Sequence, residues 1–546
     1  MQEQTDVLVV GGGPAGATAA ALLARQGHQV RVLERERFPR YHIGESLLPS
    51  LLPLLDVLGA REAVEAHGFV QKTGAYYSWG GQEWSLGFDE PGRPAAYSFQ
   101  VIRSQFDQLL LEHARAQGAD VREEVRARQV TFEDGNAGPG RRAVAAAWSS
   151  HGGAEGRIRF AHLVDASGRA GLLAARQLRT RRVHDIFRNV ATWSYWHDAA
   201  PLAAAPKGAI GVFSLPDHGW LWAIPLHDGT LSVGLVTDQR SFAHARQAAG
   251  GSLQRVYEEA IARCPLLAGL LTHARQAAPL KTESDYSYVS DAFTGPGWFL
   301  AGDAACFLDP LLSTGVHLAM YSGLLAAAIS SMLTGDIDED AARAFYQRAY
   351  QHAYERLLIL VSAFYRIHDG RDTYFRTAQQ LSRRDQAPLR LHESFLNIIT
   401  GAEDLHDTQT DDAVDTFLRT VRQPVNGRPP HGLAGHGTTD LLPLPTTPQL
   451  AAAGLYLTLT RTPTSRPTPH ERESGASPGP PAANCTPWAE ASKDSHRPHR
   501  RRPRPPPTRR FRARADRSYG MPPPTAHESA GPQAPSNSVP VRSRPG

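Results

Sequence analysis

The sequence predicts a mixed α/β fold in which a parallel sheet with crossover helices carries an inserted antiparallel sheet. A short apolar strand at residues 6–10 runs through a glycine-rich turn into an alanine-rich helix that ends near Gln26. Another apolar strand, at residues 297–301, ends in a Gly-Asp pair. Strands that alternate with helices favour a parallel sheet, whereas successive short strands favour an antiparallel one. Four short strand-like runs follow one another at 190–196, 209–214, 219–225 and 230–236, as expected for an antiparallel sheet.

The composition is that of a globular protein with one atypical segment. Of 546 residues, 41 % are hydrophobic and 21 % are charged, as in ordinary soluble proteins. The segment 424–546 holds 25 of the 41 prolines, and it carries 17 basic against 7 acidic residues. Such a segment cannot bury enough apolar surface to offset the entropy of ordering, which predicts disorder. Two interpretations stay open: an arginine-rich arm for nucleic acid or an acidic partner, and an inert, out-of-frame extension. The lack of base-reading or stacking residues favours the second.

Cysteine usage and hydropathy exclude several classes of protein. Cys264, Cys306 and Cys485 stand far apart and form no metal-binding pair, which argues against a disulfide framework and a structural zinc site. The longest apolar stretch, 318–333, contains three serines and is expected to be too short and too polar to span a membrane. No basic-then-apolar signal segment precedes the first strand, so a cytoplasmic protein is expected.

The glycine-rich turn has the spacing of a dinucleotide-binding fingerprint. Gly11 permits a tight turn, Gly13 lets the backbone approach a pyrophosphate, and Gly16 lets helix and strand pack closely. The helix that opens at Pro14 and Ala15 directs free N–H groups and a positive dipole end at the phosphates. The turn therefore predicts a phosphate-binding loop.

The strand that follows, 30–34, ends in an acid. Glu34 lies near the spacing of about 20 residues at which a carboxylate accepts the ribose hydroxyls. A surface acid at a strand end is the alternative interpretation. Because the strand, the turn, the helix and the acid all lie where the dinucleotide-binding fingerprint requires them, the sequence predicts a dinucleotide site. No second fingerprint for NAD(P)H is visible, since the glycines of 135–140 sit in a polar loop.

Four motifs in order resemble those of the FAD-dependent monooxygenase superfamily. They are the glycine turn, Arg103 before a long helix, the segment 163–169 with Asp165, and the pair Gly302–Asp303. The resemblance implies that FAD is the cofactor, with the aspartate of the last motif on its ribityl chain. It also implies a Rossmann-like FAD domain interleaved with an antiparallel-sheet substrate domain.

Composition and the strand and helix patterns, together with the resemblance, set the expected domain boundaries. In chain order they are an FAD-binding domain at 1–175 and 283–335 with substrate-domain insertions near 70–100, a substrate sheet at 176–282, a helical segment at 336–423 and a disordered tail at 424–546. The helical segment is a candidate cover for the substrate face.

Residues 218–225 resemble the W-x-W-x-I-P motif of the flavin-dependent halogenases, a branch of that superfamily. Trp220 and Trp222 are two apart and therefore share one face of a strand. The resemblance implies that they form a wall that keeps the substrate away from the flavin. Two tryptophans that pack the core are the alternative.

Residues 307–315 resemble the F-x-x-P-x-x-S-x-G pattern of the same halogenases. The resemblance implies that Thr314 and Gly315 hold the halide beside the flavin and that Ser313 belongs to the catalytic group. Backbone N–H groups at a helix start suit an anion, although a capping Ser or Thr is the alternative. The resemblance also places these residues at the cofactor: Ser46, Arg103, Asp165, Gly302, Asp303, Pro310, Gly315 and Val316.

Lys72 has the context of the catalytic lysine of the halogenases, which lies after a Gly-Glu-Ser motif, here 44–46. Lysines are scarce before the tail, where the others are Lys207 and Lys281. An amine can hydrogen-bond hypohalous acid or form a chloramine, which a guanidinium does far less readily. A lone surface lysine is the alternative.

The resemblance implies an FADH2-dependent halogenase that installs chlorine or bromine on an electron-rich aromatic ring in specialised-metabolite biosynthesis. A separate flavin reductase would supply the reduced FAD, and hypohalous acid would pass the tryptophan wall to Lys72. The sequence departs from the tryptophan-halogenase branch at Leu312, where that branch has a glutamate. This favours a phenol or pyrrole, free or tethered to a carrier protein.

Two other functions stay open, and several partners are not expected. One alternative is an FAD-dependent aromatic hydroxylase or a geranylgeranyl-reductase-like oxidoreductase, and the other is an FAD-binding scaffold without catalysis. No nucleic acid, membrane or metal partner is expected.

Overall fold

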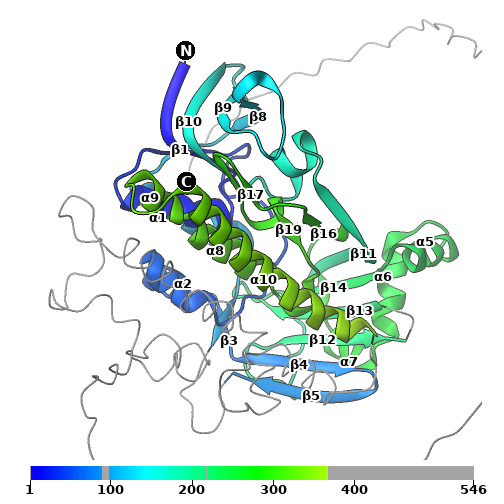
Figure 1. Ribbon diagram of the computed structural model, residues 1–546. Coiled ribbons are helices and arrows are strands. Elements are labelled where there is room, and N and C mark those ends of the chain that lie inside the picture. The colour runs from blue at the N-terminus through cyan, green and yellow to red at the C-terminus, as the bar shows by residue number, and fades with distance from the viewer. Residues whose placement is uncertain (1, 89–96, 217–218, 367–546) are drawn as a thin grey trace, which may run out of the picture. The chain divides into compact units, whose positions relative to one another are not determined.

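The computed structural model describes residues 2–88, 97–216 and 219–366 (Figure 1). The predicted disordered tail, Cys485 and the predicted helical segment beyond residue 366 lie outside the described residues. Within them, the order of strands and helices follows the predicted α/β pattern.

The first sheet is built on a parallel core. The strand order is β17-β18-β10-β1-β2-β7, with β8 and β9 added as antiparallel partners beside β10. The bounds are β1 Gln2–Val10, β2 Val30–Leu33, β7 Asp120–Arg122, β8 Val125–Phe132, β9 Ala143–Ser150, β10 Glu155–Asp165, β17 Thr294–Gly295 and β18 Trp298–Leu300. Because Val10 pairs with Asp165 and Asp165 with Leu300, the carboxyl ends of three strands meet at one edge.

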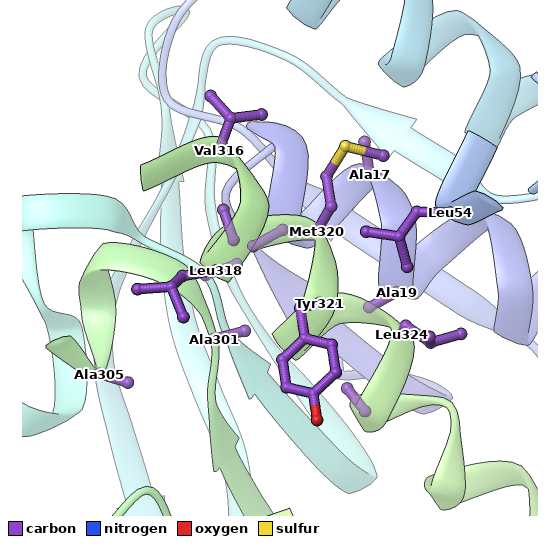
Figure 2. Close-up of a cluster of buried hydrophobic side chains, with 14 of the residues drawn as sticks. Ala17, Ala19, Leu54, Ala301, Ala305, Val316, Leu318, Met320, Tyr321 and Leu324 are labelled. Atoms are coloured by element: carbon purple, nitrogen blue, oxygen red, sulfur yellow. The ribbon is translucent and has the colours of Figure 1, made fainter. Parts of the chain in front are cut away.

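Helices from distant parts of the chain cover this sheet. They are α1 Pro14–Arg25, α2 Leu51–Leu58, α3 Arg61–Ala66, α4 Arg103–Ala116, α8 Gly315–Ala326 and α9 Ala328–Leu333. A Cβ at Gly323 would lie 2.5 Å from the Ala15 carbonyl oxygen, so this glycine allows α8 to touch α1. Figure 2 shows Met320 of α8 beside Ala17 of α1 and Leu54 of α2.

The segment 315–333 is more apolar than the sequence analysis expected. It has the length and mean hydropathy of a membrane-spanning helix, at 19 residues and 1.5. Yet 83 % of it is buried inside the fold, where α8 packs between α1 and α10 Glu339–Arg366 and α9 also contacts α10. The segment therefore has the burial of a core helix.

The second sheet is mainly antiparallel. Its order is β19-β16-β11-β14-β13-β12-β4-β5, with β15 beside β11. The bounds are β4 Gly74–Trp79, β5 Gln82–Gly87, β11 Arg181–His197, β12 Ile210–Leu215, β13 Gly219–Pro225, β14 Leu231–Asp238, β15 Arg275–Gln276, β16 Lys281–Ser290 and β19 Cys306–Phe307. The sheet thus also takes strands from 74–87 and from 283–307, beyond the range of 176–282 predicted for it.

Three helices close the far side of the second sheet with a separate apolar core. They are α5 Gln239–Ala248, α6 Leu253–Ala262 and α7 Pro265–Leu270. Phe213 and Leu221 of the sheet pack there against Tyr257 of α6. The opposite face of the sheet is consequently free to line a site.

A small third sheet has two short strands. It pairs β3 Val70–Lys72 with β6 Ser98–Gln100 in antiparallel register, so that Lys72 faces Ser98. Ser46 forms an isolated bridge with Gln100 on the other side of β6. Residues 45–47 and β3 therefore flank the same short strand.

Candidate active site

A cavity of about 470 Å³ lies where the carboxyl ends of β1, β10 and β18 face β11 and β13 of the second sheet. Ligands of open α/β sheets bind at this edge of the strands. Sixteen of the predicted site residues line it: Gly11, Gly13, Pro14, Ala15, Glu34, Ser46, Arg103, Trp220, Trp222, Gly302, Asp303, Pro310, Ser313, Thr314, Gly315 and Val316. Gly16, Lys72 and Asp165 lie behind its wall.

The glycine turn has a physical reason at each of its three positions. Gly11 has φ +105°, and a Cβ there would lie 2.2 Å from the Ala166 carbonyl oxygen. A Cβ at Gly16 would lie 2.0 Å from the Gly11 carbonyl oxygen, so both glycines are needed by the fold itself. At Gly13, a Cβ would instead meet Arg40 Nη2 at 3.3 Å, on the cavity side.

The first turn of α1 has the features of an anion-binding site. Gly13 is its N-cap and provides no side-chain cap, so N–H groups of the first turn stay available. The guanidinium of Arg40 lines the same end of the cavity. This cradle fits the pyrophosphate of FAD.

Glu34 is buried at the end of β2 and is not a surface acid. Its Oε2 accepts the Gly12 N–H at 2.7 Å, and its Oε1 accepts the Glu36 N–H at 2.9 Å. Each carboxylate oxygen has a second lone pair. The carboxylate can thus hold the glycine turn and still accept a ribose hydroxyl.

Asp165 does not occupy the position predicted for it. Its side chain is fully buried, and its two oxygens accept the N–H groups of Ser167 at 3.1 Å and Leu173 at 2.7 Å. The carboxylate therefore shapes the loop after β10, and it is Ala166, Ser167 and neighbouring residues that line the cavity. Asp165 supports the site from behind and does not face the cofactor space.

The Gly302–Asp303 pair turns the chain after β18 toward the cavity. Gly302 has φ +58° and donates its N–H to Ser322 Oγ at 2.8 Å. Burial raises the pKa of Asp303, against the lowering effect of Arg169 and Arg103. A carboxylate at this place can accept hydroxyls of a ribityl chain, as the resemblance implies.

Arg103 organises the loop before Ser46. Its guanidinium pairs with Asp107 at 2.8 Å and donates to the carbonyl oxygens of Ile43 at 2.9 Å and Gly44 at 3.2 Å. Arg40 shares the same aspartate at 2.9 Å, and the two guanidinium groups hold the pKa of Asp107 below its usual range. This buried cluster fixes residues 43–46 beside the cavity.

The predicted halide loop carries both strain and an unpaired hydroxyl. Ser313 has φ +60°, an uncommon conformation for a residue with a side chain. Thr314 precedes the first residue of α8, Gly315, and its buried Oγ1 has no hydrogen-bond partner among the described residues. An unpaired donor beside a helix N-terminus fits an anion such as a halide.

The two tryptophans of β13 both line the cavity and both have partners for their N–H groups. Trp220 Nε1 donates to Tyr365 at 2.7 Å, and Trp222 Nε1 donates to Ser232 at 3.2 Å. Gly234 on β14 makes room for Trp222, because a Cβ there would lie 2.1 Å from its ring. The rings lie on one face, as predicted, and form part of the wall between the sheets.

Lys72 is one of the most buried side chains, with 2 % of its surface exposed. Its Nζ donates to Ser46 Oγ at 2.8 Å and to the Leu47 carbonyl oxygen at 2.9 Å. Burial lowers the pKa of Lys72 to about 7. Since Ser46 lines the cavity, the amine lies directly behind that wall, and the alternative of a surface lysine is wrong.

Three residues that the sequence analysis did not single out meet beside the halide loop. Asp309 Oδ2 accepts Asn189 Nδ2 at 3.0 Å and the Tyr365 hydroxyl at 3.0 Å. Burial raises the pKa of Asp309 to about 6. The aspartate lies inside the halogenase-like motif and could have been named from it, whereas Asn189 and Tyr365 have no local signal.

Comparisons with known proteins agree with this geometry. A family model described as tryptophan halogenase matches residues 6–95 and 87–411. A tryptophan 2-halogenase from Chondromyces crocatus is 45 % identical over 431 residues, which cover 78 % of this chain and 80 % of the relative. A sulochrin halogenase from Aspergillus terreus is 41 % identical over 383 residues, which cover 66 % and 70 %.

Solved structures show the same similarity. The myxobacterial chondrochloren halogenase CndH, described as a variant of the FAD-dependent halogenases, superposes with a TM-score of 0.62 at 34 % identity. The superposition covers 73 % of this chain and 90 % of CndH. CmlS, a flavin-dependent halogenase, gives a TM-score of 0.60 at 32 % identity over 74 % of this chain and 72 % of CmlS.

Proposed function

Because the chain belongs to the flavin-dependent halogenases, we propose that it transfers chlorine or bromine to a phenol or pyrrole ring through the amine of Lys72. The enzyme class, the FAD cofactor and the halide substrate follow from the family. Family members generally take reduced FAD from a separate flavin reductase. Membership favours halogenation over the hydroxylase, reductase and scaffold alternatives.

FAD, when bound in reduced form, supplies the chemistry that activates O2 and oxidises the halide. The residues of this chain then have separable tasks. The glycine turn, Glu34 and Asp303 would hold the cofactor, and Thr314 with the start of α8 would hold the halide. The rings of Trp220 and Trp222 exclude water and substrate from the space between.

The observation that carries the proposal is the burial of Lys72 with no counter-charge from the part of the chain that the structure describes. Burial alone accounts for the lowering of the Lys72 pKa to about 7, so a large fraction of the amine is neutral at neutral pH. A neutral amine attacks the halogen of hypohalous acid: an N–X bond forms, the O–X bond breaks, and hydroxide leaves as water with a proton of the amine. The aromatic carbon then takes the halogen, its ring proton returns to nitrogen, and the amine is restored.

The proposed substrate class rests on Leu312. This residue is buried, 3 % exposed, and has no group that can accept a proton from a substrate ring. Phenols and pyrroles are activated toward electrophiles by their own heteroatom, so they need less assistance from a base. The similarity to a tryptophan 2-halogenase makes free tryptophan the competing substrate.

The test is turnover with a flavin reductase, NADH, FAD and chloride or bromide, read by mass spectrometry. The panel contains phenols and pyrroles, each free and as carrier-protein thioesters, and free tryptophan. We expect mono- or dihalogenated phenol or pyrrole. Halogenation of tryptophan in preference to every phenol and pyrrole would show that Leu312 does not set the substrate class.

A further inference from the structure

We propose that Glu45, Tyr195 and Tyr41 form a proton relay that carries a proton from the exposed Tyr41 to the buried carboxyl group of Glu45 at the cavity. The proposal rests on flavin-dependent halogenation, the activity of the family, and not on the role of Lys72 or the substrate class. The net reaction converts reduced FAD, O2, a halide ion, an aromatic C–H and one proton into FAD, an aryl halide and two waters. One proton must therefore enter the site in each turnover.

The three side chains form a continuous chain of hydrogen bonds. The Tyr195 hydroxyl donates to Glu45 Oε1 at 2.7 Å, and the hydroxyls of Tyr195 and Tyr41 lie 2.9 Å apart. Trp193 Nε1 donates to the Tyr41 hydroxyl at 2.6 Å. Because Tyr195 gives its single hydrogen to Glu45, Tyr41 must donate to Tyr195, so every hydrogen of the chain points toward the carboxyl group.

The two ends of the chain have the surroundings that a relay needs. Tyr41 lies at the other end of the chain, where 45 % of its surface is exposed and Lys281 Nζ stands 3.9 Å from the centre of its ring; it also borders the cavity. Glu45 lies at the inner end, 3 % exposed, and lines the cavity. Its Oε2 is buried and has no hydrogen-bond partner among the described residues, apart from the Ser232 hydroxyl that interacts with the carboxyl group.

The charges around Glu45 leave its carboxyl group able to gain and lose a proton. Burial raises the pKa of Glu45 to about 7, and Asp228, before β14, acts in the same direction. Arg103 from α4, Ser232 from β14 and Tyr195 from β11 act against it.

The transfer leaves the tyrosines unchanged. A solvent proton binds the Tyr41 oxygen, the Tyr41 hydrogen moves to the Tyr195 oxygen, and the Tyr195 hydrogen moves to Glu45 Oε1. Glu45 Oε2–H then gives one proton to the reaction, where it ends in water. A half-turn of the carboxyl group, which exchanges its two oxygens, and rotation of the two tyrosine hydroxyls then restore the starting state.

Hydrogen exchange of the Glu45 carboxyl group tests the relay without turnover. In the FAD-bound enzyme, infrared spectra should show a protonated-carboxyl band that titrates near pH 7 and is missing in Glu45→Gln. After transfer to D2O, Tyr195→Phe and Tyr41→Phe should each slow the isotope shift of this band by about tenfold or more, because exchange then requires local opening. Tyr257→Phe is the matched control: its hydroxyl bonds the Val233 carbonyl oxygen at 2.9 Å on the other face of the sheet, and exchange should stay fast.

Two outcomes overturn the relay. One is a Glu45→Gln spectrum that keeps the titrating band, and the other is exchange in Tyr195→Phe as fast as in Tyr257→Phe. If Tyr195→Phe gives no soluble flavoprotein, Tyr41→Phe decides, because it removes the other link of the same chain. The exchange result does not depend on which aromatic is the substrate, so it is independent of the proposed function. In single turnovers with reduced FAD, we expect Glu45→Gln to lower halogenated product by about 10²-fold.

Discussion

Trp220 donates its indole N–H to the hydroxyl of Tyr365 at 2.7 Å, which joins β13 to the end of α10. The same hydroxyl donates to Asp309 Oδ2 at 3.0 Å, in the loop that leads to the predicted halide site. Trp79 of β4 adds an edge-on ring contact to Tyr365, with centroids 6.4 Å apart. One hydroxyl therefore ties the tryptophan wall to the halide loop.

We predict that Tyr365→Phe loosens this wall. The Trp220 N–H would stay buried without a partner, which costs about 1–3 kcal/mol of unfolding free energy. Escape of hypohalous acid should lower the halogenated product formed, and raise the hypohalous acid released into solution, per reduced FAD consumed. Urea unfolding measures the loss of stability, and a reagent in solution that traps hypohalous acid measures the leak.

Tyr354→Phe provides the control for this prediction. It removes a hydroxyl of the same helix that bonds His184 Nε2 at 2.5 Å and does not line the cavity. It should lower stability and leave the product yield per reduced FAD unchanged. If Tyr365→Phe and Tyr354→Phe formed the same amount of product per reduced FAD, Tyr365 would have no role in the wall.

Lys72→Ala should abolish halogenation while FAD binding and reoxidation of reduced FAD continue. The expected loss is roughly 10²–10⁴-fold, the range for removal of a positioned catalytic group. Lys72→Arg should not restore activity, since a guanidinium is a poor nucleophile. Product analysis by mass spectrometry and flavin absorbance separate the two effects.

The matched control is Lys207→Ala, which removes an exposed amine. A surface change of this kind alters stability by about 0.5 kcal/mol or less, and activity should persist. Halogenation by Lys72→Ala at the wild-type rate would remove this lysine from the mechanism.

The pH dependence of stability should reveal the proton on Glu45. A carboxyl group with a pKa of about 7 in the folded state and 4.5 in the unfolded state binds more protons when folded between these values. The unfolding free energy of the wild type therefore falls as pH rises from 4.5 to 7, by up to about 3 kcal/mol. Glu45→Gln should lack this slope, as chemical denaturation across pH 4–9 would show. Parallel curves for the two proteins would mean that this carboxyl group titrates normally.

Two glycine substitutions should fail in different ways. Gly13→Val should lose FAD but keep the fold, because the added atoms enter the cavity side, near Arg40. Gly16→Ala should impair folding itself, because its Cβ would lie 2.0 Å from a backbone oxygen of Gly11. Flavin absorbance and circular dichroism distinguish the two. A stoichiometric yellow protein from Gly13→Val would overturn the placement of the pyrophosphate.

Removal of 424–546 should leave FAD binding and turnover intact. The family match ends at residue 411, and the composition of the tail argues against a core. Flavin content and product yield of a chain that ends at Gln423 measure this. Loss of soluble flavoprotein would show that the tail packs on the fold.

Features with a local cause were predictable from the sequence. The glycine turn depends on backbone space within a few residues, and the pairing of Trp220 and Trp222 on one face depends on strand period alone. The aspartate of 163–169 shows the limit of such reasoning. A motif fixes where Asp165 lies on a strand, but the amides of the following loop decide where its oxygens point.

Features built across the chain were not predictable. The contact of Lys72 with Ser46 exists because β6 pairs with β3 on one side and bridges to Ser46 on the other. The relay to Glu45 depends on Tyr41 and Tyr195, which are separated by more than a hundred residues. No periodicity or residue spacing in the sequence predicts either contact.

The pairing of β1 with β10 and of β10 with β18 also determines when the site can form during folding. The three strand ends that meet at the cavity belong to residues 10, 165 and 300, and α8 follows them at Gly315. During synthesis the amino-terminal strand and helix leave the ribosome long before their neighbours exist. They must wait with apolar faces uncovered, a state that invites aggregation. FAD can therefore bind only after most of the chain has been synthesised. Chains truncated before α8 should lack a flavin site.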